Sequence, residues 1–213
     1  MRIVFPKIIF GFKTRERNVC LTFDDGPHPV YTPQLLDILA DSGVRATFFI
    51  TGNKIKKYKN IVKRMISEGH EVANHGYSHR NLLFKNTQFI KNEIEKTDDL
   101  LRKCGAEGEI VFRPPFGRIS LKAFCFLGKI NKKIIMWNIP TKDFKAKSTD
   151  SILKKIYAKL RRGGIIVLHD AGKNIDSDVD RIHTVNAVKH VVVEILKRNY
   201  SFATISEMLE SNS

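Results

Sequence analysis

Two aspartates stand side by side where an apolar segment of the chain ends. In the string from Thr22 to Pro27, Asp24 and Asp25 precede a Gly-Pro pair that turns the chain sharply. Two carboxylates this close repel each other, and the pKa of one of them rises unless a cation lies between them. A bound metal ion would remove the repulsion, whereas a solvated turn would explain the same residues without any chemistry.

Two histidines stand four residues apart in the string Asn74-His75-Gly76-Tyr77-Ser78-His79. One turn of helix would bring both imidazoles to the same side. Two histidines and one carboxylate form a ligand set for zinc or another divalent metal, with positions left open for water and substrate. A pair of exposed or capping histidines is the alternative interpretation.

An arginine and a third histidine also stand in segments that favour a fixed geometry. Two prolines directly follow Arg113, and the rigid backbone they impose can aim the guanidinium at a carboxylate. His169 ends the apolar run of residues 165–168, which makes it a candidate general acid at the end of a strand. As alternatives, the first segment is an ordinary turn and the second a polar residue that reaches solvent.

Strands and helices alternate along the chain and predict how these residues are positioned. Apolar segments rich in β-formers alternate with amphipathic helical patterns, and the predicted strands cover residues 19–23, 46–51, 71–74, 110–113, 133–137, 165–169 and 201–204. This alternation predicts an α/β fold with a parallel sheet or barrel. In barrel enzymes the chemistry lies in the loops after the strands, where all the candidate residues stand.

The helix predicted over residues 54–68 has an apolar face formed by Ile55, Val62 and Met65. Its lysines, Lys54 among them, occupy the rest of the circumference. A charge run of this kind indicates a solvated helix face.

In their order along the chain, these strings resemble the five motifs of the polysaccharide deacetylase family, also called the NodB-homology domain or carbohydrate esterase family 4. The matching segments are residues 22–27, 75–79, 113–117, 137–144 and 168–170. The resemblance implies a distorted (β/α) barrel with seven or eight mostly parallel strands. It also divides the chain into an N-terminal strand or extension over residues 1–18 and a catalytic domain over residues 19–213.

The resemblance further implies a role for each candidate residue. The metal, usually zinc with cobalt, nickel or manganese as alternatives, would be held by Asp25, His75 and His79. Asp24 would be the general base that takes a proton from the attacking water, and Arg113 would orient it. His169 would be the general acid that protonates the departing amine, supported by Asp143. The pocket for the acetyl methyl group would be formed by Phe116, Trp137, Phe144 and Leu168.

Some positions depart from the usual pattern of the family. Gly76 stands where a serine or threonine is common, and Phe116 replaces a tyrosine. In the fourth motif, Pro140 and the pair Asp143-Phe144 replace an aspartate and an Asp-Trp pair. The metal ligands, acid and base are unaffected, so these departures concern the identity of the substrate.

Composition limits the partners and the compartment. A formal charge of +15 on 213 residues attracts the protein to anionic surfaces, such as a membrane or a cell-wall polymer. Nucleic acid is disfavoured as a partner because no helix-turn-helix, zinc-finger or RNA-binding signature accompanies the charge.

Residues 1–12 make a poor signal peptide and are too short to span a bilayer. Three cysteines without paired spacing indicate ordinary thiols and not a disulfide framework. A cytoplasmic or membrane-peripheral location is therefore expected. The sequence leaves the oligomeric state open.

Three functions are consistent with these features. The first is removal of N-acetyl groups from N-acetylated amino sugars in a chitin-like oligomer, peptidoglycan or an exopolysaccharide. The second is deformylation or deacetylation of a lipid-linked amino sugar, for which a basic surface suits an anionic membrane. The third is glycan binding through a catalytically silent site.

Overall fold

Parallel strands form the centre of the fold. The computed structural model describes residues 6–175 and 179–212. In this part of the chain the strands follow the order β4-β3-β2-β7-β6, with β8 beside β2 and β1 beside β5, and every pairing among them is parallel. Their bounds are β1 (Ile8–Ile9), β2 (Asn18–Asp24), β3 (Thr47–Ile50), β4 (Glu71–Asn74), β5 (Ile134–Ile135), β6 (Ile139–Pro140), β7 (Gly164–His169) and β8 (Ser201–Phe202).

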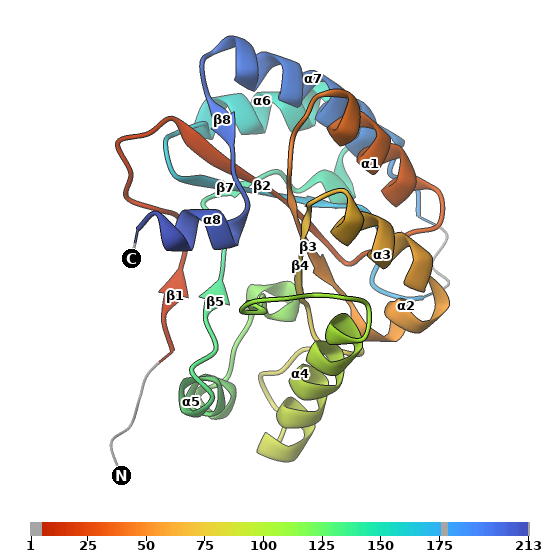
Figure 1. Cartoon of the computed structure of the whole chain (residues 1–213), viewed down its shortest axis with the longest axis vertical. Coiled ribbons are helices and arrows are strands. Elements are labelled where there is room, and N and C mark those ends of the chain that lie inside the picture. Colours follow the sequence, from red (N-terminus) through yellow and green to blue (C-terminus); the bar gives the residue numbers. More distant parts are fainter. Residues whose placement is uncertain (1–5, 176–178, 213) are drawn as a thin grey trace.

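Phe112 connects the two groups of strands. It bridges to Asn74 at the end of β4 and to Ile134 in β5. The chain then runs from β5 into β6, which pairs with β7. The strands therefore follow one another around a distorted barrel whose hydrogen bonding is interrupted (Figure 1). The α/β fold with seven or eight mostly parallel strands, predicted from the sequence, is confirmed.

The fourth predicted strand, residues 110–113, is shorter than expected. Only Phe112 has strand pairing there, although the N–H of Arg113 still donates to the carbonyl of Asn74 at 2.9 Å. Pro114 and Pro115 have no N–H to continue a ladder. The two prolines therefore end the strand directly after the arginine.

Strand residues alternate between two faces, and this alternation directs the site residues. Val19, Leu21 and Phe23 of β2 belong to the main core cluster, which also contains residues of α1, α3, α6 and α7. Cys20, on the other face, packs with Phe49, Ala73, Val111, Ile135 and Ile165 in a second cluster. Because side chains two apart share a face, Asp24 points to the same side as Cys20, into the barrel.

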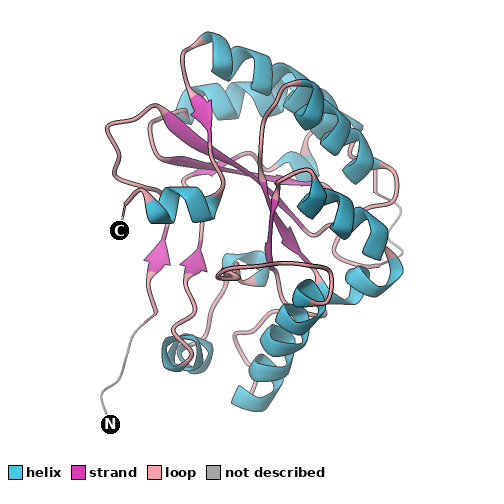
Figure 2. Ribbon diagram, viewed as in Figure 1, coloured by secondary structure: helices cyan, strands magenta, loops and turns pink. Residues whose placement is uncertain are grey.

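Most helices lie around the outside of the strands (Figure 2). The helices are α1 (Tyr31–Asp41), α2 (Gly52–Lys57), α3 (Lys59–Ser67), α4 (Thr87–Arg102), α5 (Leu121–Lys129), α6 (Thr149–Lys159), α7 (Ile182–Lys197) and α8 (Ile205–Glu210). Ile205 and Met208 of α8 instead pack in the second cluster, with Cys20. The buried residues of the helices recur at helical spacing, for example Ile90, Ile94 and Leu101 on α4, as expected for amphipathic helices. No helix in the described residues combines the length and apolar character that crossing a bilayer requires.

The helix predicted over residues 54–68 is in fact two helices. Tyr58 has φ −123° and ψ 36°, which is outside the helical region, and it separates α2 from α3. The prediction that Lys54 belongs to a solvated face is wrong, because Lys54 is only 2% exposed. Its ammonium group points into the protein, where carbonyl groups of two distant loops accept its hydrogen bonds.

Candidate active site

Asp25, His75 and His79 come together at the carboxyl ends of β2 and β4. The Nε2 atom of His79 lies 2.9 Å from Oδ1 of Asp25, and the Nε2 atom of His75 lies 3.5 Å from the same oxygen. One ligand atom of each residue lies within 4.8 Å of the others, and all three residues are buried. The structure thus brings together the three residues for which the sequence predicts metal binding.

The two histidines meet through a loop and not through the predicted turn of helix. Residues 75–80 contain no helical turn. Gly76 has φ +78° and His79 has φ +51°, and two left-handed residues are incompatible with a right-handed helix. The four-residue spacing therefore indicated the right pair of side chains for the wrong local reason.

The donor atoms fit a divalent cation. The Nδ1 atom of His75 lies 2.8 Å from the carbonyl oxygen of Arg113. With a metal ion bound, a proton on Nδ1 would donate to this carbonyl and leave the Nε2 lone pair free to bind the ion, as in metal sites whose histidines are oriented by a second hydrogen bond. Burial alone would raise the pKa of Asp25, but hydrogen bonds from both histidines and the charge of His169 hold it well below its ordinary value. Two imidazole nitrogens and an ionised carboxylate are a suitable set for zinc.

Arg113 holds Asp24 in the barrel interior. Its NH1 group donates to Oδ1 of Asp24 at 2.6 Å and to Oγ1 of Thr22 at 2.8 Å. Its Nε and NH2 groups donate to the carbonyls of Ile135 and Met136. The guanidinium is fully buried and lies 3.8 Å from the centre of the Phe49 ring. Fixed on all sides, it forms a charge-assisted hydrogen bond with Asp24 and limits that side chain to one orientation.

His169 and Asp143 form a second charge pair, in which Asp143 is buried and His169 is half-buried. The Nδ1 atom of His169 donates to Oδ1 of Asp143 at 2.7 Å. The other carboxylate oxygen accepts from the backbone N–H of His169 at 2.8 Å and from Thr184 at 2.9 Å. Burial alone would lower the pKa of His169, but the charge and hydrogen bond of Asp143 raise it to about 9. The imidazole is therefore protonated at neutral pH and has a proton to donate.

Two exposed aromatic rings flank the histidines. The ring of Phe116 lies 4.7 Å from that of His79, and the ring of Phe144 lies edge-on, 5.0 Å from that of His169. They are 44% and 45% exposed. Trp137 is half-buried, and a Cβ at Gly117 would lie 2.7 Å from its ring. Of the four predicted pocket residues, Phe116 and Phe144 thus lie beside His79 and His169, and the Trp137 ring lies 5.6 Å from the guanidinium of Arg113.

Leu168 is not positioned to line the acetyl pocket as predicted. It is fully buried in the main core cluster between the strands and the helices. Alternation along β7 directs its side chain away from that of His169. Val167, two residues before His169 and 4% exposed, shares the face of the histidine, so the same alternation rule applied to the sequence would have selected it.

Lys54 is a further site residue that the sequence did not indicate. Its Nζ atom donates to the carbonyl of Asp25 at 2.7 Å and to that of Gly172 at 2.5 Å. Each of the two neighbouring aspartates thus contacts its own buried cation. Arg113 binds the side chain of Asp24, and Lys54 binds the backbone carbonyl of Asp25. Within a run of lysines, no local signal distinguishes Lys54 from its exposed neighbours.

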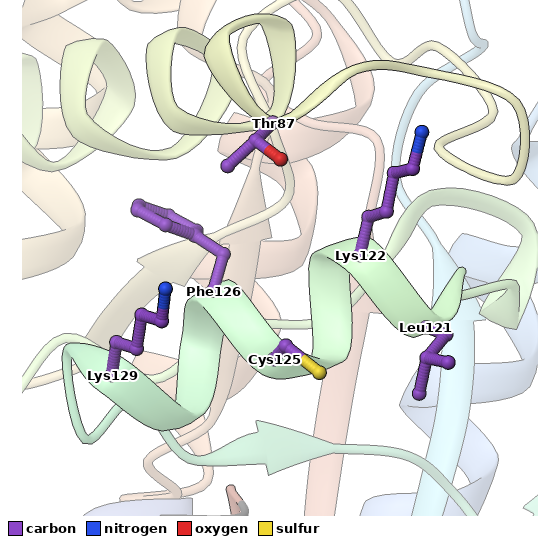
Figure 3. A pocket seen from close by; sticks show the side chains of 6 residues that line it. All are labelled: Thr87, Leu121, Lys122, Cys125, Phe126 and Lys129. Atoms are coloured by element: carbon purple, nitrogen blue, oxygen red, sulfur yellow. The ribbon is translucent and has the colours of Figure 1, made fainter. Parts of the chain in front are cut away.

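A surface hollow of about 300 Å³ lies apart from this centre. It is lined by residues of α5 and the start of α4: Thr87, Leu121, Lys122, Cys125, Phe126 and Lys129 (Figure 3). None of these is a histidine or a carboxylate. The hollow therefore lacks the groups that the chemistry considered above requires.

Comparison with known proteins agrees with the geometry. The family model described as polysaccharide deacetylase matches residues 12–132. A peptidoglycan-N-acetylglucosamine deacetylase of Bacillus cereus is 33% identical over 204 residues, which cover 95% of this chain and 72% of that protein. A chitooligosaccharide deacetylase of Sinorhizobium fredii is 34% identical over 154 residues, which cover 72% of each chain.

A solved structure has the same fold over nearly the whole chain. It is the crystal structure of a peptidoglycan N-acetylglucosamine deacetylase in complex with 4-naphthalen-1-yl-N-oxidanyl-benzamide. The two chains superpose with a TM-score of 0.89 at 31% sequence identity, over 94% of this chain and 92% of the other. The ordered motifs, the barrel and these similarities agree: the chain belongs to the polysaccharide deacetylase family.

Proposed function

We propose that this protein is a divalent-metal-dependent hydrolase that removes N-acetyl groups from N-acetylated amino sugars of a glycan, with residues 19–213 as its catalytic domain. One observation carries the proposal. Asp24 and His169 are register partners at the ends of β2 and β7, beside the metal-binding triad. A candidate general base and a candidate general acid thus lie next to each other, as amide hydrolysis requires.

Asp25, His75 and His79 would hold the metal. Zinc is the ion that two imidazoles and one carboxylate favour, and cobalt, nickel or manganese are alternatives. A divalent ion in such a site lowers the pKa of water toward about 7 and polarises a carbonyl group. Asp24 accepts the proton of the attacking water, and Arg113 keeps that carboxylate oriented.

His169 supplies the proton that the amide nitrogen needs in order to leave as an amine. In the metal-free protein burial is outweighed by the Asp143 carboxylate, which raises the pKa of His169 to about 9, so the imidazole carries this proton at neutral pH. Phe116, Trp137 and Phe144 would form the apolar surroundings of the acetyl methyl group. Val167 would replace Leu168 in this role, since it lies on the His169 face of β7.

A glycan that carries carboxylates, as peptidoglycan does, suits the rim of the site. The Nζ atom of Lys173 lies 4.9 Å from the centre of the Phe116 ring, and that of Lys145 lies 5.8 Å from the Phe144 ring. Each exposed aromatic ring beside the site therefore has a cation next to it. Together with the net charge of +15, this favours N-acetylglucosamine units of peptidoglycan over a neutral chitin oligomer, and a peripheral contact with cell-wall polymer or an anionic membrane.

Acetate release tests the proposal. The zinc-loaded protein is incubated with peptidoglycan fragments, chitooligosaccharides and a lipid-linked amino sugar, and acetate and formate are measured. We expect acetate from the glycans, and a loss of at least ~100-fold in Asp24→Asn, the usual scale for removing a general base, with zinc still bound. Asp41→Asn, the same change at an exposed position on α1, should retain full activity.

Three other results would contradict the proposal. Full activity of Asp24→Asn would show that the base is a different residue. Glycan binding without any acetate from any substrate would favour the catalytically silent alternative. Formate release from the lipid-linked sugar alone would move the substrate to the second alternative.

A further inference from the structure

The first turn of α2 contacts all three loops that carry the proposed active site. The N–H of Thr51 donates to the carbonyl of Gly26 at 3.1 Å, next to Asp25. The N–H groups of Gly52 and Asn53 donate to the carbonyls of Gly76 and Tyr77, both at 2.9 Å, in the loop between the two histidines. This turn therefore holds the two ligand loops in a fixed relation to each other.

Lys54 extends these contacts to the third loop. Its ammonium group donates to the carbonyl of Asp25 and to that of Gly172, three residues after His169. The side chain is almost completely buried. Burial of an ammonium group is unfavourable unless its hydrogen bonds and charge are compensated, and here the two carbonyls and the nearby carboxylates of Asp170 and Asp25 provide the compensation.

Asp25 has a backbone conformation that requires outside support. Its φ is +76°, a left-handed value that non-glycine residues adopt only when the surrounding structure imposes it. The Lys54 ammonium binds the carbonyl of this residue, and the Thr51 hydroxyl lies 3.4 Å from the same oxygen. Fixing that carbonyl fixes the backbone from which the Asp25 carboxylate projects toward His75 and His79.

The close approach of α2 to the histidine loop is also built into the sequence. A Cβ at Gly52 would lie 2.4 Å from Oγ1 of Thr97 and 2.8 Å from the ring of Tyr77. Only glycine allows the helix to start this near the loop. The contact of Lys54 with Asp25 is therefore one part of a fixed arrangement and not an isolated hydrogen bond.

We infer that Lys54 is a positioning residue of the metal centre, which sets metal affinity by holding the Asp25 carboxylate in its binding geometry. The inference rests on the metal site of the proposed function, but it concerns binding of the ion and not turnover.

Zinc affinity and stability, measured together, test the inference. Metal-free full-length protein is titrated with zinc in competition with a chromophoric chelator, and thermal unfolding is followed without metal. We expect Lys54→Met to bind zinc at least ~10-fold more weakly, the scale observed when groups that orient metal ligands are removed, and its cobalt complex to have an altered visible spectrum. Lys56→Met, the same change at an exposed position of α2, should behave as the wild type.

The outcomes separate clearly. Wild-type zinc affinity in Lys54→Met, or an equal loss in Lys56→Met, overturns the inference. If Lys54→Met does not fold without metal, Lys54→Arg is measured instead, because it keeps a cationic donor. A zinc affinity within about threefold of the wild type supports the role. A tenfold loss of zinc affinity in a folded protein overturns it. If zinc binding weakens as expected but the wild type releases no acetate, the proposed function fails and the role of Lys54 stands.

Discussion

Removing the charge of Asp143 should change the protonation of His169 in a predictable way. In the metal-free protein the pKa of His169 is about 9, because the charge and hydrogen bond of Asp143 outweigh burial. Asp143→Asn keeps a polar side chain but removes the charge, and burial then favours the neutral imidazole. We expect the pKa of His169 to fall toward its ordinary value of 6.5, with the charges of Asp25 and Asp24 still opposing burial.

The same change should alter stability in a defined pH window. The difference between about 9 and 6.5, at about 1.4 kcal/mol for each pH unit, corresponds to about 3 kcal/mol. Because the folded pKa is raised, this stabilisation is fully present below pH 6.5 and is lost as the pH rises through 9. The stability of the wild type relative to Asp143→Asn should therefore shrink by about 3 kcal/mol between pH 5.5 and pH 9.5. Asp143 itself titrates below this window, since His169 and its hydrogen bonds lower its pKa against the effect of burial.

Two measurements on metal-free protein check this prediction. NMR titration of labelled histidine gives the pKa, and urea unfolding at the two pH values gives the stability. Thr184→Val is the control, because it removes a neutral hydrogen bond to Asp143 and leaves the charge. It should leave the pKa near 9 and cost the same stability at both pH values. A pKa that stays near 9 in Asp143→Asn, or a stability difference independent of pH, would refute the reasoning.

Three further predictions follow from particular contacts. Burial lowers the pKa of His70 to about 4, so the folded state does not take up the proton that the unfolded state binds below pH 6.5. The free energy of unfolding should therefore fall by up to about 3 kcal/mol between pH 6.5 and 4. Urea unfolding of His70→Gln should show a flatter pH dependence than that of the wild type. A Cβ at Gly26 would lie 2.2 Å from Oδ2 of Asp170, so Gly26→Ala should lower the stability measured by thermal unfolding by about 2 kcal/mol or more. The control Gly43→Ala, at φ +60° and in open space, should lower it by only about 1 kcal/mol. Equal losses of stability would contradict the steric argument. Lys173→Glu should lower kcat/KM on carboxylate-bearing peptidoglycan fragments at least threefold and leave neutral chitooligosaccharides unaffected, and parallel effects on both would remove the case for an anionic substrate.

Local sequence patterns predicted the fold because they are set by local physics. The apolar run that becomes β2 ends in Asp24, and the run that becomes β7 ends in His169. Parallel pairing then brings the two residues into register. The strand over residues 110–113 was overestimated because an apolar run does not show how many of its residues find strand partners, and here only Phe112 bridges to neighbouring strands.

The errors concern contacts that only the tertiary structure creates. Sequence spacing suggested a helical turn for His75 and His79, but the loop that joins them is shaped by donors from α2. Lys54 looked like part of a solvated face because its partners, the carbonyls of Asp25 and Gly172, are distant in the sequence. The choice of Leu168 was different, since alternation along the strand was available in the sequence and pointed to Val167.

X-ray absorption at the zinc edge tests the central claim most directly. For protein loaded with one equivalent of zinc, the geometry predicts two imidazole nitrogens together with oxygen ligands at about 2.0–2.2 Å, and a changed spectrum with weaker binding in His79→Ala. Sulfur at about 2.3 Å, or a spectrum and affinity unaffected by His79→Ala, would contradict a metal centre formed by Asp25, His75 and His79.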